Sequence, residues 1–163
     1  MKKLISIFVI TVTFISCANS KNIIDYPDFY KTHKNDVNVT SFRLPICFIS
    51  GFLKNEDKDL KQLLKNADNL NFFIAEDNTT NLLNELNIYL PAKQYKDVMI
   101  INDDGNKISF KVREKNNSIS EIIMLIEEDN EFVVISIEGN FTYDEIKTFI
   151  NSVDTEKIKT TKE

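Results

Sequence analysis

The stretch DVMIINDDGNKISFKVREKNNSISEIIMLIEEDNEFVVISIE, residues 97–138, decides the fold of this chain. It contains four runs of β-prone residues, at 97–102, 107–115, 118–127 and 131–138. The separators at 103–106, 116–117 and 129–130 consist of Asp, Asn and Gly, which tolerate the positive φ of hairpin turns. Because connections of about two to five residues cannot make a parallel crossover, the four strands are predicted to form one antiparallel meander.

The residues before and after this stretch favour helices with one apolar stripe. Apolar residues recur at helical spacing after residue 23, in 46–53 behind Pro45, in 56–67 and in 79–90, and again after Asn140 or Thr142, either of which can cap a final helix. Residues 36–44 favour β-structure, and residues 70–75 are predicted to form a further strand. The sequence therefore predicts an α+β fold, an antiparallel sheet with helices packed mainly on one face.

The N-terminus has the pattern of a bacterial export signal that ends in a cysteine. Lys2 and Lys3 precede an apolar segment at 4–15 that is short for a membrane span. The next residues, Phe-Ile-Ser-Cys at 14–17, resemble a lipobox, in which the cysteine is acylated with fatty acids such as palmitate and becomes the first residue. An ordinary cleaved signal with Cys17 near the cut by chance is the alternative.

This interpretation predicts four segments along the chain. They are a lipoprotein signal peptide at 1–16, a lipidated tether at 17–22, a single α+β domain at 23–153 and a polar tail at 154–163. Removing 16 residues from 163 leaves 147, enough for one hydrophobic core. The expected location is the cell envelope, on the periplasmic side of the inner membrane or on the outer membrane, attached through the lipid at Cys17.

The charge of the chain argues against nucleic acid as a partner. The formal charge is −5, and loss of Lys2 and Lys3 with the signal takes it to −7. Nucleic-acid binding needs clustered Lys and Arg. We expect the membrane, reached through the lipid, and an unknown protein or small ligand as partners.

Few residues offer catalytic or metal-binding chemistry. His33, the single histidine of the sequence, lies in a charged segment, so we expect it on the surface and away from any pocket. Cys47 lies among apolar residues, which predicts a buried, slowly reacting thiol. One histidine cannot build a zinc site of two or three His ligands. We therefore expect no catalytic residue, no cofactor and no metal.

Carboxylates gather at two turns instead. Glu127, Glu128, Asp129 and Glu131 lack the ligand spacing and glycine of an EF-hand loop. Residues 103–105, Asp-Asp-Gly, read as a hairpin turn rather than an acid–base pair. Both clusters are interpreted as solvated turns.

Residues 95–149 contain, in this order, YKDVM, an Asp-Gly hairpin, KVRE, a Ser-Glu-hydrophobic strand, ISIEGNF and a closing helix. This order resembles a known family, domain of unknown function 4252, found mainly in envelope lipoproteins of Bacteroidetes. It implies a small α+β lipoprotein and carries over no catalytic residue.

Together these features predict a membrane-anchored, non-enzymatic binding or protein-interaction module. A sheet face or groove with exposed aromatic residues would favour it. The alternatives are an envelope hydrolase with an unrecognised carboxylate-based site, which needs a polar cleft, and an envelope signalling or stress-response component.

Replacing Cys17 by Ala should abolish acylation, because the thiol is the group that accepts the lipid. Palmitate labelling and detergent partitioning of the expressed chain measure this. A Cys17→Ala protein that still labels and stays with the membrane would contradict the lipobox interpretation.

Overall fold

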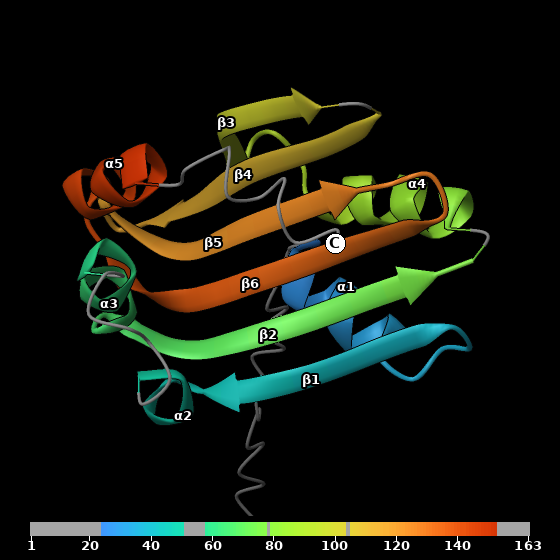
Figure 1. Ribbon diagram of the computed structural model, residues 1–163, viewed down its shortest axis with the longest axis horizontal. Coiled ribbons are helices and arrows are strands. Elements are labelled where there is room, and N and C mark those ends of the chain that lie inside the picture. The colour runs from blue at the N-terminus through green and yellow to red at the C-terminus, as the bar shows by residue number, and fades with distance from the viewer. Residues whose placement is uncertain (1–23, 51–57, 78, 104, 153–163) are drawn as a thin grey trace, which may run out of the picture.

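The computed structural model describes residues 24–50, 58–77, 79–103 and 105–152. These residues form six strands and five helices (Figure 1). The strands are β1 (Val39–Pro45), β2 (Ala67–Glu76), β3 (Tyr95–Asp103), β4 (Asn106–Lys115), β5 (Ser118–Glu127) and β6 (Glu131–Phe141). The helices are α1 (Tyr26–His33), α2 (Ile46–Ser50), α3 (Lys58–Leu64), α4 (Thr80–Tyr89) and α5 (Tyr143–Ser152).

The strands form one sheet in the order β1-β2-β6-β5-β4-β3. Every neighbouring pair is antiparallel. The predicted meander is therefore confirmed as β3 to β6, and the α+β class with it. The β1–β2 pair, which comes earlier in the sequence, extends the sheet on the free side of β6 (Figure 1).

Helices cover both faces of this sheet, so the expectation that they pack mainly on one face is wrong. On the first face, α1 and α4 bury Phe29 and Leu86 against Phe73 of β2 and Val134 of β6. On the second face, α3 and α5 cover strand residues that alternate with these. The physical reason is that β2, β5 and β6 carry apolar residues at consecutive positions, and successive side chains point to opposite faces.

The second core lies at one end of its face. Leu63 of α3 and Ile146 of α5 pack with Leu70, Ile122 and Ile137 of the strands. In Figure 1, α2, α3 and α5 lie together at this end, and α1 and α4 lie behind the sheet. None of the helices in the described ranges is long and apolar enough to span a membrane.

Some predicted boundaries move. The helix predicted at 56–67 is α3, which ends at Leu64 because the chain enters β2 at Ala67. The strand predicted at 70–75 extends over all of β2, and β6 continues to Phe141. Of the helix predicted at 46–53, the part up to Ser50 is α2, and 51–53 lie outside the described residues.

The last helix begins with a capping box. The Thr142 amide and hydroxyl donate to Oε2 of Glu145 at 2.8 and 2.9 Å, and the Glu145 amide donates back to the Thr142 hydroxyl at 3.2 Å. These hydrogen bonds to Thr142 lower the pKa of Glu145. Thr142, rather than Asn140, is therefore the residue that caps α5.

Gly139 of β6 is required by a close backbone approach. A Cβ at this position would lie 2.3 Å from the carbonyl oxygen of Asn66 and 2.9 Å from Cα of Ala67. The same carbonyl accepts the Asn140 amide at 3.0 Å. The connection from α3 to β2 is therefore held directly against β6, which places α3 over the sheet.

Replacing Gly139 by Ala should lower the free energy of unfolding by about 1–3 kcal/mol, since backbone must move to admit the methyl group. Gly105→Ala is the matched control. Its Cβ would meet nothing within 4 Å, so only the strain of a φ of +88° remains, about 1–2 kcal/mol at most. Urea unfolding measures both, and a Gly139→Ala protein as stable as the parent would contradict the close approach.

Candidate functional site

The half of the second face that lies away from α3 and α5 carries several partly exposed apolar residues. In Figure 1 this half extends from α3 and α5 toward the opposite strand ends. Two cross-strand rows of apolar residues run over it. The inner row, in strand order from β1 to β3, is Phe42, Phe72, Ile135, Met124, Phe110 and Met99. The outer row is Thr40, Ile74, Val133, Ile126, Ile108 and Ile101.

The apolar members of these rows form the open half of the sheet. Phe42 is 39% exposed and its ring stacks on Phe72 with centroids 4.6 Å apart. Met99, Met124 and Ile126 are partly exposed, and neither core cluster contains them.

Phe110 and Ile108 of β4 interrupt the open half, because they are 1% and 7% exposed, and the Phe110 ring lies 6.4 Å from that of Phe149 of α5. Phe72 and Ile135 of the inner row pack against the second core. The partly exposed apolar residues that remain on both sides of β4 form a candidate binding surface.

Carboxylates border the open half at the strand ends farthest from α3. Glu76 of β2 lies two residues after Ile74, and Glu131 of β6 lies two residues before Val133. Because side chains alternate between faces along a strand, both carboxylates lie on the second face. With the neighbouring turn they line a hollow of about 480 Å³. We call its acidic members the acidic rim: Glu76, Asp77, Glu128, Asp129 and Glu131.

The acidic rim is built by backbone hydrogen bonds between turns. The Asp77 amide donates to the carbonyl oxygen of Asn130 at 2.9 Å, and the Glu128 amide donates to that of Glu131 at 2.9 Å. These bonds hold the end of β2 beside the β5–β6 turn. Across the described ranges no three His, Cys, Asp or Glu side chains converge as metal ligands. The acidic rim is therefore a surface of negative charge rather than a built cation site.

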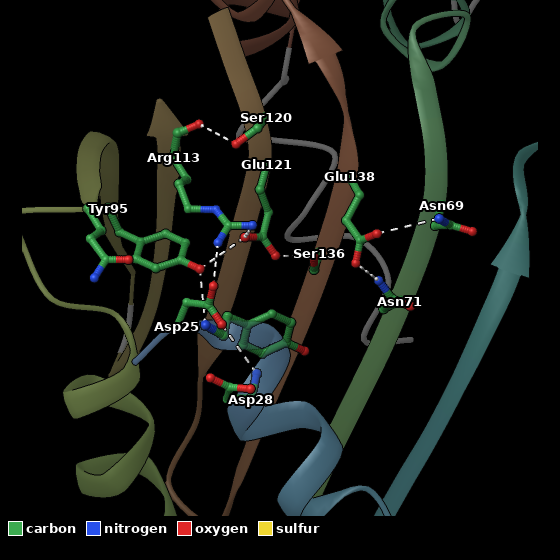
Figure 2. Close-up of polar contacts among 12 residues, drawn as sticks. Asp25, Asp28, Asn69, Asn71, Tyr95, Arg113, Ser120, Glu121, Ser136 and Glu138 are labelled. Carbon is green, nitrogen blue, oxygen red and sulfur yellow. Dashed lines mark hydrogen bonds and ion pairs between the residues drawn. The ribbon is translucent and has the colours of Figure 1, made fainter. Parts of the chain in front are cut away.

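The first face carries a buried polar cluster that sequence reasoning missed (Figure 2). Tyr95, Arg113 and Glu121 are direct cross-strand neighbours on β3, β4 and β5. Glu121 is fully buried; it accepts the Tyr95 hydroxyl at 3.0 Å and the Ser136 hydroxyl at 2.8 Å, and pairs with Arg113 at 3.1 Å. Arg113 also donates to Asp25 at 2.6 Å. Only the alternation of charge among apolar strand residues could have indicated it.

This cluster fixes where α1 begins. Asp25 is the N-cap of α1, and its carboxylate both accepts the Asp28 amide at 3.4 Å and pairs with Arg113. The Tyr26 amide donates to the Tyr95 hydroxyl at 3.0 Å. The first turn of the helix is therefore bonded to two strands.

Burial dominates the titration of the cluster. It raises the pKa of Glu121, although Arg113, Ser136 and Tyr95 each act to lower it. Burial by itself would lower the pKa of Arg113, but its interactions with Glu121, Tyr95 and Asp25 together outweigh burial and raise the pKa. The guanidinium also lies 5.7 Å from the centre of the Tyr95 ring. A shifted carboxyl in a closed set of partners favours a structural clamp over an open acid–base site.

A second carboxylate lies beside the cluster. Glu138 of β6 is the direct cross-strand neighbour of Glu121. It accepts from Asn71 at 3.2 Å and from Asn69 and Arg43 at 3.4 Å. Donors from β3, β4 and β6 therefore serve Glu121, and donors from β2 and the edge strand β1 serve Glu138.

His33 does not lie free on the surface as predicted. Its side chain is 12% exposed, with Nδ1 2.7 Å from Asp36 and Nε2 3.1 Å from Glu85 of α4. It also lines a hollow of about 320 Å³ between α1, α4 and β2. Burial alone would lower its pKa, but the hydrogen bonds to Asp36 and Glu85 outweigh burial and raise it. His33 therefore joins α1 to α4.

Cys47 is exposed on α2, so the prediction of a buried thiol is wrong. The short helix turns its apolar stripe, Ile46 and Ile49, to the second core, which leaves Cys47 and Phe48 outside. Of the acidic turns, residues 127–131 are a turn as predicted but also line the hollow of the acidic rim. Cys17, the predicted lipidation site, lies outside the described residues.

Comparison with known proteins identifies the family. A family model, Domain of unknown function (DUF4252), matches residues 30–149. The chain belongs to this family. The match covers β1 to β6 and most of α5, and so includes the open half and nearly all of the buried polar cluster. Searches of curated proteins and of solved structures found no match.

Replacing Arg113 by Met should cost about 3–5 kcal/mol of stability at pH 8, because it leaves the buried Glu121 carboxylate without its cation. Arg113 lowers the pKa of Glu121, so its loss raises that pKa further. A carboxyl whose folded pKa exceeds its unfolded value loses stability as pH rises through the folded pKa. The deficit should therefore shrink as pH falls toward about 4.5.

Urea unfolding at several pH values measures this deficit. Lys111→Met is the matched control on the same strand and face, since it removes the more exposed pair with Asp97 and should cost less than about 1 kcal/mol. The double variant Arg113→Met, Glu121→Leu should regain most of the lost stability. An equal deficit at pH 4.5 and pH 8 would show that Glu121 is not the group left uncompensated.

Proposed function

We propose that the chain is a lipid-anchored, non-enzymatic protein-interaction module of the bacterial cell envelope, and that the open half of the sheet is its contact surface. The signal pattern and Cys17 support the location and the anchor. The open half supports the activity, because partly exposed apolar side chains such as Phe42, Met124 and Ile126 are costly in water unless something covers them. A signalling or stress-response role would use the same surface through a partner.

The geometry of the polar residues favours this proposal over a hydrolase. The most perturbed carboxyl, Glu121, is fully buried and is occupied by three donors. A general acid or base must reach its substrate through a hydrogen bond or one water molecule. His33 is likewise engaged by two carboxylates. Neither group offers a free position to a substrate in this arrangement.

Methionine oxidation tests whether the open half is covered in cells. Met99 and Met124 are the two methionines in the described ranges, and both lie on the inner row. If the surface is a contact site, their oxidation to sulfoxide should be at least about threefold slower in intact envelopes than in purified protein at high dilution. Mass spectrometry of the two peptides measures the rates.

Two controls accompany this experiment. An Ile88→Cys, Cys47→Ser variant places a thiol at a residue that is 63% exposed on α4, which packs on the first face, so its alkylation rate should not change between the two samples. A chain ending at Ser152 reports whether residues 153–163 cover the surface instead. Equal oxidation rates in envelope and dilute solution, or protection that disappears with residues 153–163, would contradict the proposal.

A further inference from the structure

Helix α4 is attached to the first face mainly through apolar contacts with α1 and the sheet. Leu86 joins Phe29 of α1 in the first core, and the Tyr89 ring lies edge-on to Phe29 with centroids 5.6 Å apart. In the part of the chain that the structure describes, the contact of Glu85 with His33 is the one side-chain hydrogen bond that joins α4 to another helix or strand. Because apolar contacts are non-directional, this polar contact fixes how α4 lies against α1.

The ring of His33 lies between two carboxylates. Its Nδ1 is 2.7 Å from Asp36, which follows α1, and its Nε2 is 3.1 Å from Glu85 of α4. The ring also packs on Phe29 with centroids 4.7 Å apart, which restricts its orientation. An ionised carboxylate can only accept hydrogen bonds, so both ring nitrogens have to donate. The two contacts together therefore require the doubly protonated, positively charged imidazole.

Loss of one proton removes one of these two contacts. A neutral imidazole has one N–H and one lone pair, and the lone pair would then face a carboxylate oxygen. The contact with Asp36 is the shorter and joins residues three positions apart, so we expect the remaining proton at Nδ1. The contact with Glu85 is then the one that is lost. Helix α4 would keep its apolar contacts alone.

We propose that His33 is a proton-dependent latch for α4: the imidazolium holds α4 on α1, and the neutral ring releases it. The latch lies on the first face and involves no residue of the open half, so it goes beyond the proposed function and does not rest on it.

His33 is the group of its hollow that changes charge near neutral pH. The other titratable groups that line the hollow are carboxyls, from the connection between α1 and β1, from the end of β2 and from α4: Asp36, Glu76, Asp77 and Glu85. Carboxyl side chains ordinarily ionise near pH 4, well below the range in which an imidazole loses its proton. The state of the latch between pH 6 and pH 8.5 therefore follows the imidazole.

The latch is closed on the acidic side of this titration. Burial alone would lower the pKa of His33, but the hydrogen bonds to Asp36 and Glu85 raise it. A histidine whose folded pKa exceeds the unfolded value of about 6.5 stabilises the fold fully below that value, and its contribution is lost as pH rises through the folded pKa. Helix α4 should therefore be held at pH 6 and loosened at pH 8.5.

Hydrogen exchange tests the latch in the full chain, purified in detergent with Cys47→Ser so that no thiol titrates in the same range. The protection factor of the α4 amides, which is corrected for the intrinsic pH dependence of exchange, should fall about tenfold between pH 6 and pH 8.5, as expected for one charge-assisted hydrogen bond. The amides of α5 are the internal control. Their protection should change less than about twofold, since local opening of α4 leaves α5 in place.

Glu85→Gln is the matched variant. Its amide has nearly the shape of the carboxylate and can donate to a neutral Nε2, so the contact with His33 no longer needs the second proton. The protection of α4 should then change less than about twofold over the same range, because local opening no longer follows the charge of the ring. Circular dichroism at both pH values shows that the variant has folded.

The pKa of His33 gives a second measurement. Because the sequence contains one histidine, a single NMR ring signal reports this pKa, which should lie above about 6.5 in the parent and fall in Glu85→Gln. A pKa at or below the unfolded value would overturn the latch. So would α4 protection that does not depend on pH, a fall shared equally by α5, or the same fall in Glu85→Gln.

Discussion

The constraint on which this structure depends is that β2, β5 and β6 carry apolar side chains on both faces. Strand geometry sends neighbours such as Phe72 and Phe73 to opposite sides, so one sheet has two surfaces to remove from water. The described chain covers the first face with α1 and α4 and only one end of the second with α2, α3 and α5. The open half is the part of the second face that α2, α3 and α5 leave partly exposed.

The buried polar cluster fixes the orientation of α1 on the first face of the sheet. Apolar contacts between α1 and the sheet are non-directional, whereas the bonds from Arg113 to Asp25 and from the Tyr26 amide to Tyr95 fix both position and rotation. Burying Glu121 carries a desolvation cost that its partners offset. The cluster therefore contributes to the uniqueness of the helix position more than to stability.

Charged side chains are distributed differently on the second face. Its apolar rows lie between the acidic rim and α3, which carries Lys58 and Lys61 against Asp59. Charged side chains of the buried polar cluster on the first face pair with one another, whereas those of the acidic rim and α3 lie at the surface. Because of this difference, we interpret the first face as the interior of the domain and the open half of the second face as a contact surface.

The sequence by itself determined the meander and the approximate helix positions, because hairpin spacing and helical periodicity are local features. It also indicated the family. It left the cap of α5 open between Asn140 and Thr142, and the structure assigns it to Thr142. It did not decide how many faces the helices cover, and it placed Cys47 and His33 wrongly. Whether an apolar run is covered depends on where distant helices pack. The polar partners of His33 and Glu121 lie far apart in the chain: Glu85 is 52 positions from His33, and Arg113, which pairs with Glu121, also pairs with Asp25, 88 positions away. Only the pairing of β3, β4, β5 and β6 under α1 brings the buried polar cluster together, and only the packing of α3 and α5 at one end of the sheet leaves part of the second face partly exposed.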